Sequence, residues 1–257
     1  MARVTATTAG PGPATTRPEG PSLHERPPVT PGTFFAGRRP LLGAVAALFV
    51  LLALGAAVAG GRLLLSWDEP VQRFVEEHRT AALDRFFLTT SRFGSTVFVF
   101  PMGALLVALT WRRCRAVGLA LGAAMLGRPL LEFALKESIG RDRPDLDRMV
   151  DGVGHSFPSG HVLAAVALWG LLPVVVGLFT RRRTLWWASV VVAGAMIVGI
   201  GASRVYLGVH WLSDVVGGLL LGVLFLIGVE RVLHHAHRLG GCGAGPRPAG
   251  AGRAPAS

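Results

Sequence analysis

Residues 184–229 read TLWWASVVVAGAMIVGIGASRVYLGVHWLSDVVGGLLLGVLFLIGV. The stretch holds two apolar runs, Thr184 to Ala202 and Trp211 to Val229, which a short polar segment, 203–210, separates. Each run is long enough to cross the hydrocarbon core of a bilayer, because a helix rises about 1.5 Å per residue. The stretch therefore predicts two consecutive membrane helices joined by a short polar loop.

Similar apolar runs recur through the chain, which is 51% hydrophobic. We therefore predict an all-α, polytopic membrane protein with a bundle of six transmembrane helices over residues 40–233. Residues 1–39 are rich in Pro, Thr, Ala and Gly and, like residues 234–257, are predicted to be a disordered tail. The four remaining spans are predicted at Leu41–Gly60, Ser95–Trp111, Ala116–Leu135, which polar residues interrupt, and Val162–Thr180.

The formal charge of +11 comes mainly from arginines in a tail and in short clusters between the apolar runs. This placement favours anionic lipid headgroups and membrane topology over nucleic acid as its cause. In a six-helix count, the clusters at 112–115 and 181–183 fall on one side, which is then cytoplasmic, together with both termini. The loops 61–94, 136–160 and 203–210 are expected on the external face of the cell membrane, and Val75–Phe87 is expected to form a surface helix there.

Polar side chains in such an apolar chain must be satisfied by partners or water, so they mark candidate sites. They concentrate in the external loops, where Lys136, Arg143 and Arg204 supply three cations. Guanidinium groups match the oxygens of phosphate in bidentate fashion. Ser159 and Gly160 precede the fourth helix, where a hydroxyl can cap the helix and free backbone N–H groups can face an anion. These residues indicate a phosphate site.

Two histidines and a carboxylate accompany these cations. His210 and Asp214 are four residues apart, so they share a face if the sixth helix begins near His210. The carboxylate can then bond one imidazole nitrogen and leave the other free as a nucleophile toward phosphorus. His161 could protonate the leaving oxygen. The pattern therefore predicts catalytic roles for His210, His161 and Asp214.

Three motifs carry a resemblance to a known family. They are Lys-x6-Arg-Pro at 136–144, Pro-Ser-Gly-His at 158–161 and Ser-Arg-x5-His-x3-Asp at 203–214. Together and in this order they resemble the signature of the type 2 phosphatidic acid phosphatase superfamily. Trp211-Leu212 and Asp142 depart from residues common in relatives, which leaves the subfamily open.

The resemblance implies a metal-independent membrane phosphatase without a cofactor, acting on a lipid phosphate or diphosphate through a phosphohistidine. The substrate could be an isoprenoid diphosphate such as undecaprenyl diphosphate, or a glycerolipid phosphate such as phosphatidic acid or phosphatidylglycerophosphate. It implies His210 as nucleophile, Asp214 as its orienting partner and His161 as general acid. The phosphate would be held by Lys136, Arg143, Ser159, Gly160 and Arg204.

Other interpretations stay open. Arg128 and Glu132, four residues apart within a predicted span, are expected to form an internal ion pair, although a proton or substrate path is an alternative. A transporter or flippase, and a phosphoryl transferase to an acceptor other than water, are the alternative functions. His155 is expected to have a structural role, and His234, His235 and His237 are read as an interfacial basic segment and not as metal ligands. Cys114 and Cys242 are predicted to be free thiols.

Overall fold

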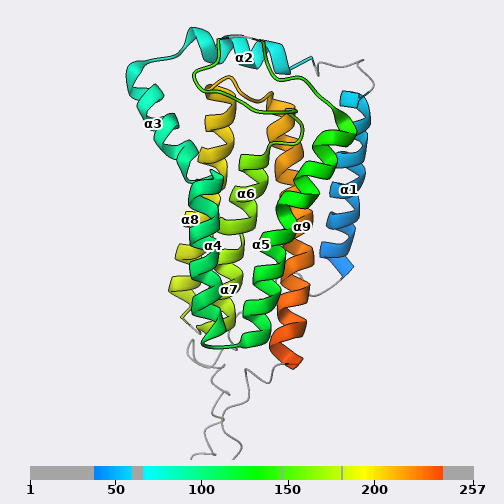
Figure 1. The fold of residues 1–257 in the computed structure, drawn as a ribbon, viewed down its shortest axis with the longest axis vertical. Coiled ribbons are helices and arrows are strands. Elements are labelled where there is room, and N and C mark those ends of the chain that lie inside the picture. Colours follow the sequence, from blue (N-terminus) through cyan, green and yellow to red (C-terminus); the bar gives the residue numbers. More distant parts are fainter. Residues whose placement is uncertain (1–37, 60–65, 146, 181, 240–257) are drawn as a thin grey trace, which may run out of the picture.

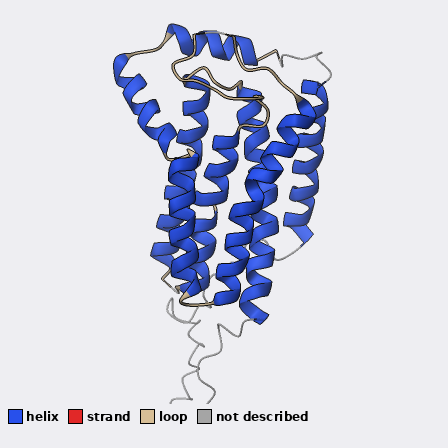
Figure 2. Ribbon diagram, in the orientation of Figure 1, coloured by secondary structure: helices blue, strands red, loops and turns tan. Residues whose placement is uncertain are grey.

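The computed structural model describes residues 38–59, 66–145, 147–180 and 182–239. All regular structure in this part of the chain is helical, as predicted (Figure 2). Most of both predicted tails lies outside the described residues, and so does Cys242.

The helices form one elongated bundle with a short helix lying across one end (Figure 1). That crossing helix is α2, and α6 lies in the middle of the bundle, where it packs against α4, α5, α8 and α9. The helices are α1 Arg38–Ala59, α2 Asp68–Glu77, α3 Ala81–Arg92, α4 Thr96–Trp111, α5 Arg115–Ile139, α6 Gly160–Trp169, α7 Leu171–Phe179, α8 Arg183–Tyr206 and α9 Leu212–Leu239.

Four segments of the described chain are long and apolar enough to cross a membrane: α5, α6 with α7, α8 and α9. A fifth exists if α3 and α4, which meet at a bend of 44°, form one broken span. The shorter apolar helix α1 lies beside α5 and α9 (Figure 1). Large apolar side chains on the outer faces of α5 and α8 are exposed, as expected for surfaces that face lipid: Leu119, Leu126, Leu130, Val191 and Val198.

Glycines on α9 allow it to approach α6 closely. A Cβ at Gly218 would lie 2.7 Å from the Ser159 carbonyl oxygen, and one at Gly222 would lie 2.7 Å from the Val166 Cβ. Small residues spaced by four let membrane helices pack backbone against backbone. The close approach matters for function, because it brings the start of α6 against the start of α9.

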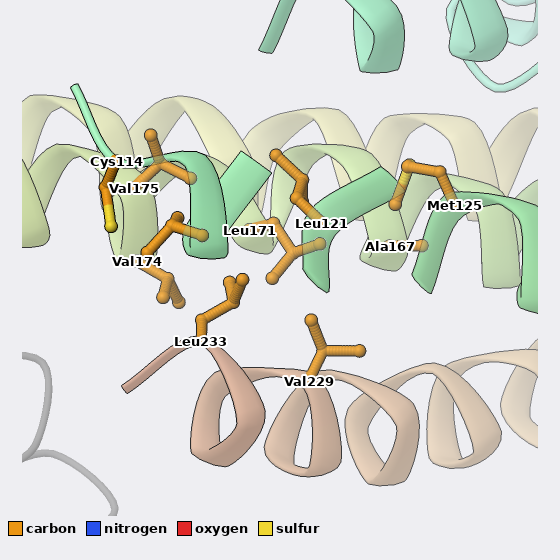
Figure 3. Close-up of a cluster of buried hydrophobic side chains, with 10 residues drawn as sticks. Cys114, Leu121, Met125, Ala167, Leu171, Val174, Val175, Val229 and Leu233 are labelled. Atoms are coloured by element: carbon orange, nitrogen blue, oxygen red, sulfur yellow. The ribbon is translucent and has the colours of Figure 1, made fainter. Parts of the chain in front are cut away.

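Away from the starts of α6 and α9, a cluster of buried apolar side chains packs α5, α6, α7 and α9 against one another (Figure 3). Leu121, Leu171 and Leu233 are fully buried there. Cys114, at the edge of the cluster, is disulfide-bonded, so the prediction of a free thiol at this position was wrong.

Two predicted boundaries differ from the structure. The expected surface helix Val75–Phe87 is broken, because α2 ends at Glu77 and α3 starts at Ala81, where the Thr80 hydroxyl caps the new helix by accepting from the Leu83 N–H at 3.3 Å. Helix α9 continues to Leu239, beyond the domain boundary predicted at residue 233. His234, His235 and His237 therefore lie on a helix and not in a disordered tail.

The glycine contact gives a test of the packing. Gly222→Ala should destabilise the protein by about 1–3 kcal/mol, because the new methyl group collides with Val166. Gly228→Ala is the matched control on the same helix, since its Cβ meets nothing within 4 Å. Thermal unfolding in detergent should show a lower Tm for the first variant only. Equal Tm values would contradict the proposed close packing of α6 and α9.

Candidate active site

The three sequence motifs gather at one end of the bundle. The loop between α5 and α6 and the loop between α8 and α9 lie at the same end, beneath α2 (Figure 1). The Met149 N–H donates to the Leu207 carbonyl at 3.1 Å, and the Trp211 indole N–H donates to the Asp142 carbonyl at 3.3 Å. These bonds fasten the two loops to each other, so residues far apart in sequence line one site.

His210 and Asp214 are in contact at the centre of this end. The His210 Nδ1 lies 3.4 Å from the Asp214 Oδ2, and both side chains are buried. Helix α9 begins at Leu212 and not at His210, so the pair does not share a helix face. The contact forms because Asp214 in the first turn points back over the helix start, where its Oδ2 also accepts the Trp211 backbone N–H at 2.9 Å. Such a bond satisfies an N–H group at the helix start.

Burial determines the charge of the imidazole. It lowers the pKa of His210 to about 4, and the hydrogen bond with Asp214 only partly opposes this effect. Arg204 and Arg143 nearby also disfavour a second positive charge. The imidazole is therefore neutral at neutral pH. With Nδ1–H directed at Asp214, Nε2 carries the free lone pair.

Arg143 lies beside that lone pair. Its Nη1 is 3.3 Å from the His210 Nε2 and donates to the Val209 carbonyl at 2.8 Å. Its Nε donates to the Gly154 carbonyl at 2.9 Å. Arg143 thus connects the two loops and holds a cation where a nucleophile on His210 would meet an anion.

Lys136 and Arg204 supply the other cations. The Lys136 ammonium, in the last turn of α5, donates to the His155 carbonyl at 2.9 Å and lies 3.7 Å from the Glu132 carboxylate. Arg204, in the last turn of α8, donates to the Ser91 hydroxyl at 2.6 Å. Within the described chain its Nε has no partner although it is buried. A buried donor without a partner is costly unless a ligand satisfies it.

The start of α6 lies at the same end of the bundle, beside Asp214. Ser159 occupies the N-cap, and its N–H donates to the Asp214 carbonyl at 3.0 Å. The predicted capping bond from its hydroxyl is absent, and this buried hydroxyl has no partner in the described chain. Gly160 is required because a Cβ there would collide with the Glu132 carboxylate. The Glu132 carboxylate therefore packs directly against the first residue of α6.

His161, the next residue of α6, lies near the same groups. Arg204 and His210 are among its charged or ionisable neighbours, together with Lys136 and Arg143. Its ring lies behind Gly94, where a Cβ would be 3.5 Å from the His161 Cδ2. All eight predicted site residues therefore lie near one another at the same end of the bundle: Lys136, Arg143, Ser159, Gly160, His161, Arg204, His210 and Asp214.

The structure adds residues that sequence reasoning missed. Arg141 donates to the Asp214 Oδ1 at 2.6 Å and to the Asp68 Oδ2 at 2.8 Å. Asp68 accepts the Ser213 backbone N–H at 2.9 Å. Arg141 stands inside the first motif, but its spacing gave no reason to pair it with Asp214. Asp68 lies outside every motif and had no sequence signal.

The ion pair predicted within the bundle, between Arg128 and Glu132, lies near the site. The Arg128 Nη1 lies 2.8 Å from the Glu132 Oε2, which confirms the predicted ion pair. Because Glu132 also approaches Lys136, the pair extends to the site and is not isolated within the bundle. The described residues include no group of three or more side chains arranged to hold a metal ion.

Fold and site together define a multi-pass helical membrane protein with a cluster of cationic side chains at one end and a neutral histidine in contact with a carboxylate. Comparison with known proteins refines this class. The family model described as the PAP2 superfamily matches residues 117–238, which contain all three motifs. This segment of the chain belongs to the PAP2 superfamily.

Named relatives agree with this assignment. Over 188 residues the chain is 29% identical to phosphatidylglycerophosphatase B of Bacillus subtilis, which covers 71% of this chain and 91% of that protein. It is 26% identical to an undecaprenyl-diphosphatase of Sulfolobus acidocaldarius over 68% of this chain and 82% of that protein. The crystal structure of a transmembrane PAP2 type phosphatidylglycerolphosphate phosphatase from Bacillus subtilis matches with a TM-score of 0.65 at 29% identity, covering 73% of this chain and 94% of that one.

Proposed function

We propose that this protein is a membrane lipid phosphatase that hydrolyses a phosphomonoester or diphosphate of a lipid through a phosphohistidine on His210. The observation that carries the proposal is the neutral His210, bound to Asp214 on one side and facing Arg143 on the other. The names of its relatives, a phosphatidylglycerophosphatase and an undecaprenyl-diphosphatase, support a lipid substrate.

In the first step, the Nε2 lone pair of His210 attacks phosphorus and the bond from phosphorus to the lipid oxygen breaks. His161 donates a proton to that oxygen, which leaves as a lipid alcohol or, from a diphosphate, as a lipid monophosphate. Asp214 stabilises the positive charge that develops on the imidazole. Its position 3.4 Å from Nδ1 supports this role.

In the second step, a water molecule attacks the phosphorus of the phosphohistidine. Its proton passes to His161, the nitrogen–phosphorus bond breaks and inorganic phosphate leaves. Lys136, Arg143 and Arg204 neutralise the phosphoryl oxygens, while the Ser159 hydroxyl and the N–H groups at Gly160 donate to them. The unpartnered Ser159 hydroxyl and Arg204 Nε support these assignments. No metal takes part in the proposed steps.

We place the site on the external face of the cell membrane, with both termini cytoplasmic. This topology requires six spans. Four are α5, α6 with α7, α8 and α9, the bent pair α3 and α4 would be the fifth, and the shorter apolar helix α1 would be the sixth. Arg112, Arg113, Arg182 and Arg183 then lie at the cytoplasmic end, opposite the site. The membrane phosphatase domain would begin near residue 40, as predicted from the sequence, and extend to the end of α9 at Leu239.

A panel of lipid substrates tests the reaction. The purified protein should release phosphate from phosphatidylglycerophosphate, phosphatidic acid or undecaprenyl diphosphate, and excess chelator should leave the rate unchanged. His210→Asn should lower the rate by about 10³-fold or more, because the nucleophile is lost. His155→Asn is a matched control, since that residue contributes only its backbone carbonyl. Release of phosphate by His210→Asn at the parent rate would contradict the mechanism, and lipid movement without phosphate release would favour a transporter.

A second test addresses the orientation in the membrane. Cysteines are introduced at Val153, a side chain that is 91% exposed at the site end, or at Arg113 at the other end, in a background without native cysteines. A thiol reagent that cannot cross membranes should label Val153→Cys on intact cells and Arg113→Cys only after lysis. The reverse pattern would mean that the site faces the cytoplasm and would contradict the proposed orientation.

A further inference from the structure

A single guanidinium group holds two buried carboxylates together behind the catalytic pair. Arg141 lies 2.6 Å from the Asp214 Oδ1 and 2.8 Å from the Asp68 Oδ2. The Arg141 side chain is 8% exposed, and both carboxylates are 0% exposed. Opposite charges buried this deeply attract each other strongly. Removing one of them leaves the other buried without a partner, which destabilises the protein.

Each oxygen of Asp214 has its own donors. Oδ1 accepts from Arg141, while Oδ2 accepts the Trp211 N–H and faces the His210 Nδ1. The bond from Arg141 therefore fixes the rotation of the carboxylate. If that bond were absent, the carboxylate could turn and direct either oxygen away from the imidazole.

Asp68 holds Arg141 in turn. Its Oδ2 accepts from Arg141 and from the Ser213 hydroxyl, and its Oδ1 accepts the Ser213 N–H at 2.9 Å. Asp68 is the first residue of α2, the helix that crosses the end of the bundle (Figure 1). It lies outside the segment that matches the family model, 117–238. Helix α2 thus reaches the catalytic pair through one buried side chain.

We propose that Asp68 and Arg141 are positioning residues for the reaction, and that α2 completes the active site through them. Arg141 orients Asp214, and Asp68 fixes Arg141 and balances its charge. The inference rests on the proposed function of His210 as nucleophile. It makes the first turn of α2 part of the catalytic apparatus, although no sequence motif marks it.

The charges predict effects of opposite sign on His210. The charged and titratable groups around its imidazole are Asp214, Arg143, Arg204 and His161, and Arg141 and Asp68 stand behind Asp214. Removing the positive Arg141 removes a charge that disfavours the imidazolium, so the pKa of His210 rises. Removing the negative Asp68 leaves the charge of Arg141 unbalanced, so the pKa of His210 falls.

The experiment compares Arg141→Gln and Asp68→Asn across pH. Both should lower kcat by about 10-fold to 100-fold while KM changes by less than about threefold, as is usual for residues that orient a catalytic group. The acid limb of the kcat/KM profile should move to higher pH in Arg141→Gln and to lower pH in Asp68→Asn. Arg141→Lys, which keeps the charge, should recover part of kcat and the parent profile. Asp147→Asn is the control, because it also breaks an ion pair, here with Arg79, but the Asp147 side chain is 89% exposed.

Substrate-free measurements separate this proposal from the proposed function. The pKa of His210, followed by NMR of histidine-labelled protein, should shift in the same two directions without any lipid. If the parent enzyme releases no phosphate from any lipid yet these shifts occur, the proposed function fails and the positioning network stands. Shifts of the same sign, no shift, or variants that lose thermal stability but keep kcat would overturn the inference. Should Arg141→Gln fail to fold, two results decide: a lowered pKa of His210 in Asp68→Asn and an unchanged pKa in Arg141→Lys.

Discussion

The contact between the Asp214 carboxylate and the His210 imidazole is the interaction on which the rest of the site depends. The Asp214 carboxylate is fully buried, so each of its oxygens needs a donor. The backbone of Trp211 and the guanidinium of Arg141 provide these donors. The glycines of α9 also support this contact, because they bring the start of α6 close enough for the Ser159 N–H to donate to the Asp214 carbonyl at 3.0 Å.

The bundle separates two chemical environments along its length. One half holds a cluster of buried apolar side chains (Figure 3), and the other end collects the cations, both histidines of the motifs and the buried carboxylates. Positive groups around a neutral imidazole create a site that attracts an anion without a charged nucleophile. This arrangement suits a substrate whose charged head must stay at the membrane surface while its apolar part stays in lipid.

The sequence predicted the helices with long apolar runs and the polar residues that gather at one end of the bundle, because membrane length and fixed motif spacing are local properties. It predicted the contact of His210 with Asp214 for a partly wrong reason, since α9 starts at Leu212 and Asp214 reaches back over the helix end. The capping bond expected from the Ser159 hydroxyl is absent. Asp68 could not have been found, because its partners lie 73 and 145 residues away and no periodicity links them.

The central claim is that His210 attacks phosphorus directly. The most direct measurement mixes the enzyme with lipid phosphate labelled with radioactive phosphorus, quenches the reaction with alkali during turnover and maps the labelled peptide. The account predicts a label that is stable in alkali, labile in acid and located on the peptide that contains His210, and no label in His210→Asn. Turnover without any label on that peptide, or with the label on another residue, would contradict the account.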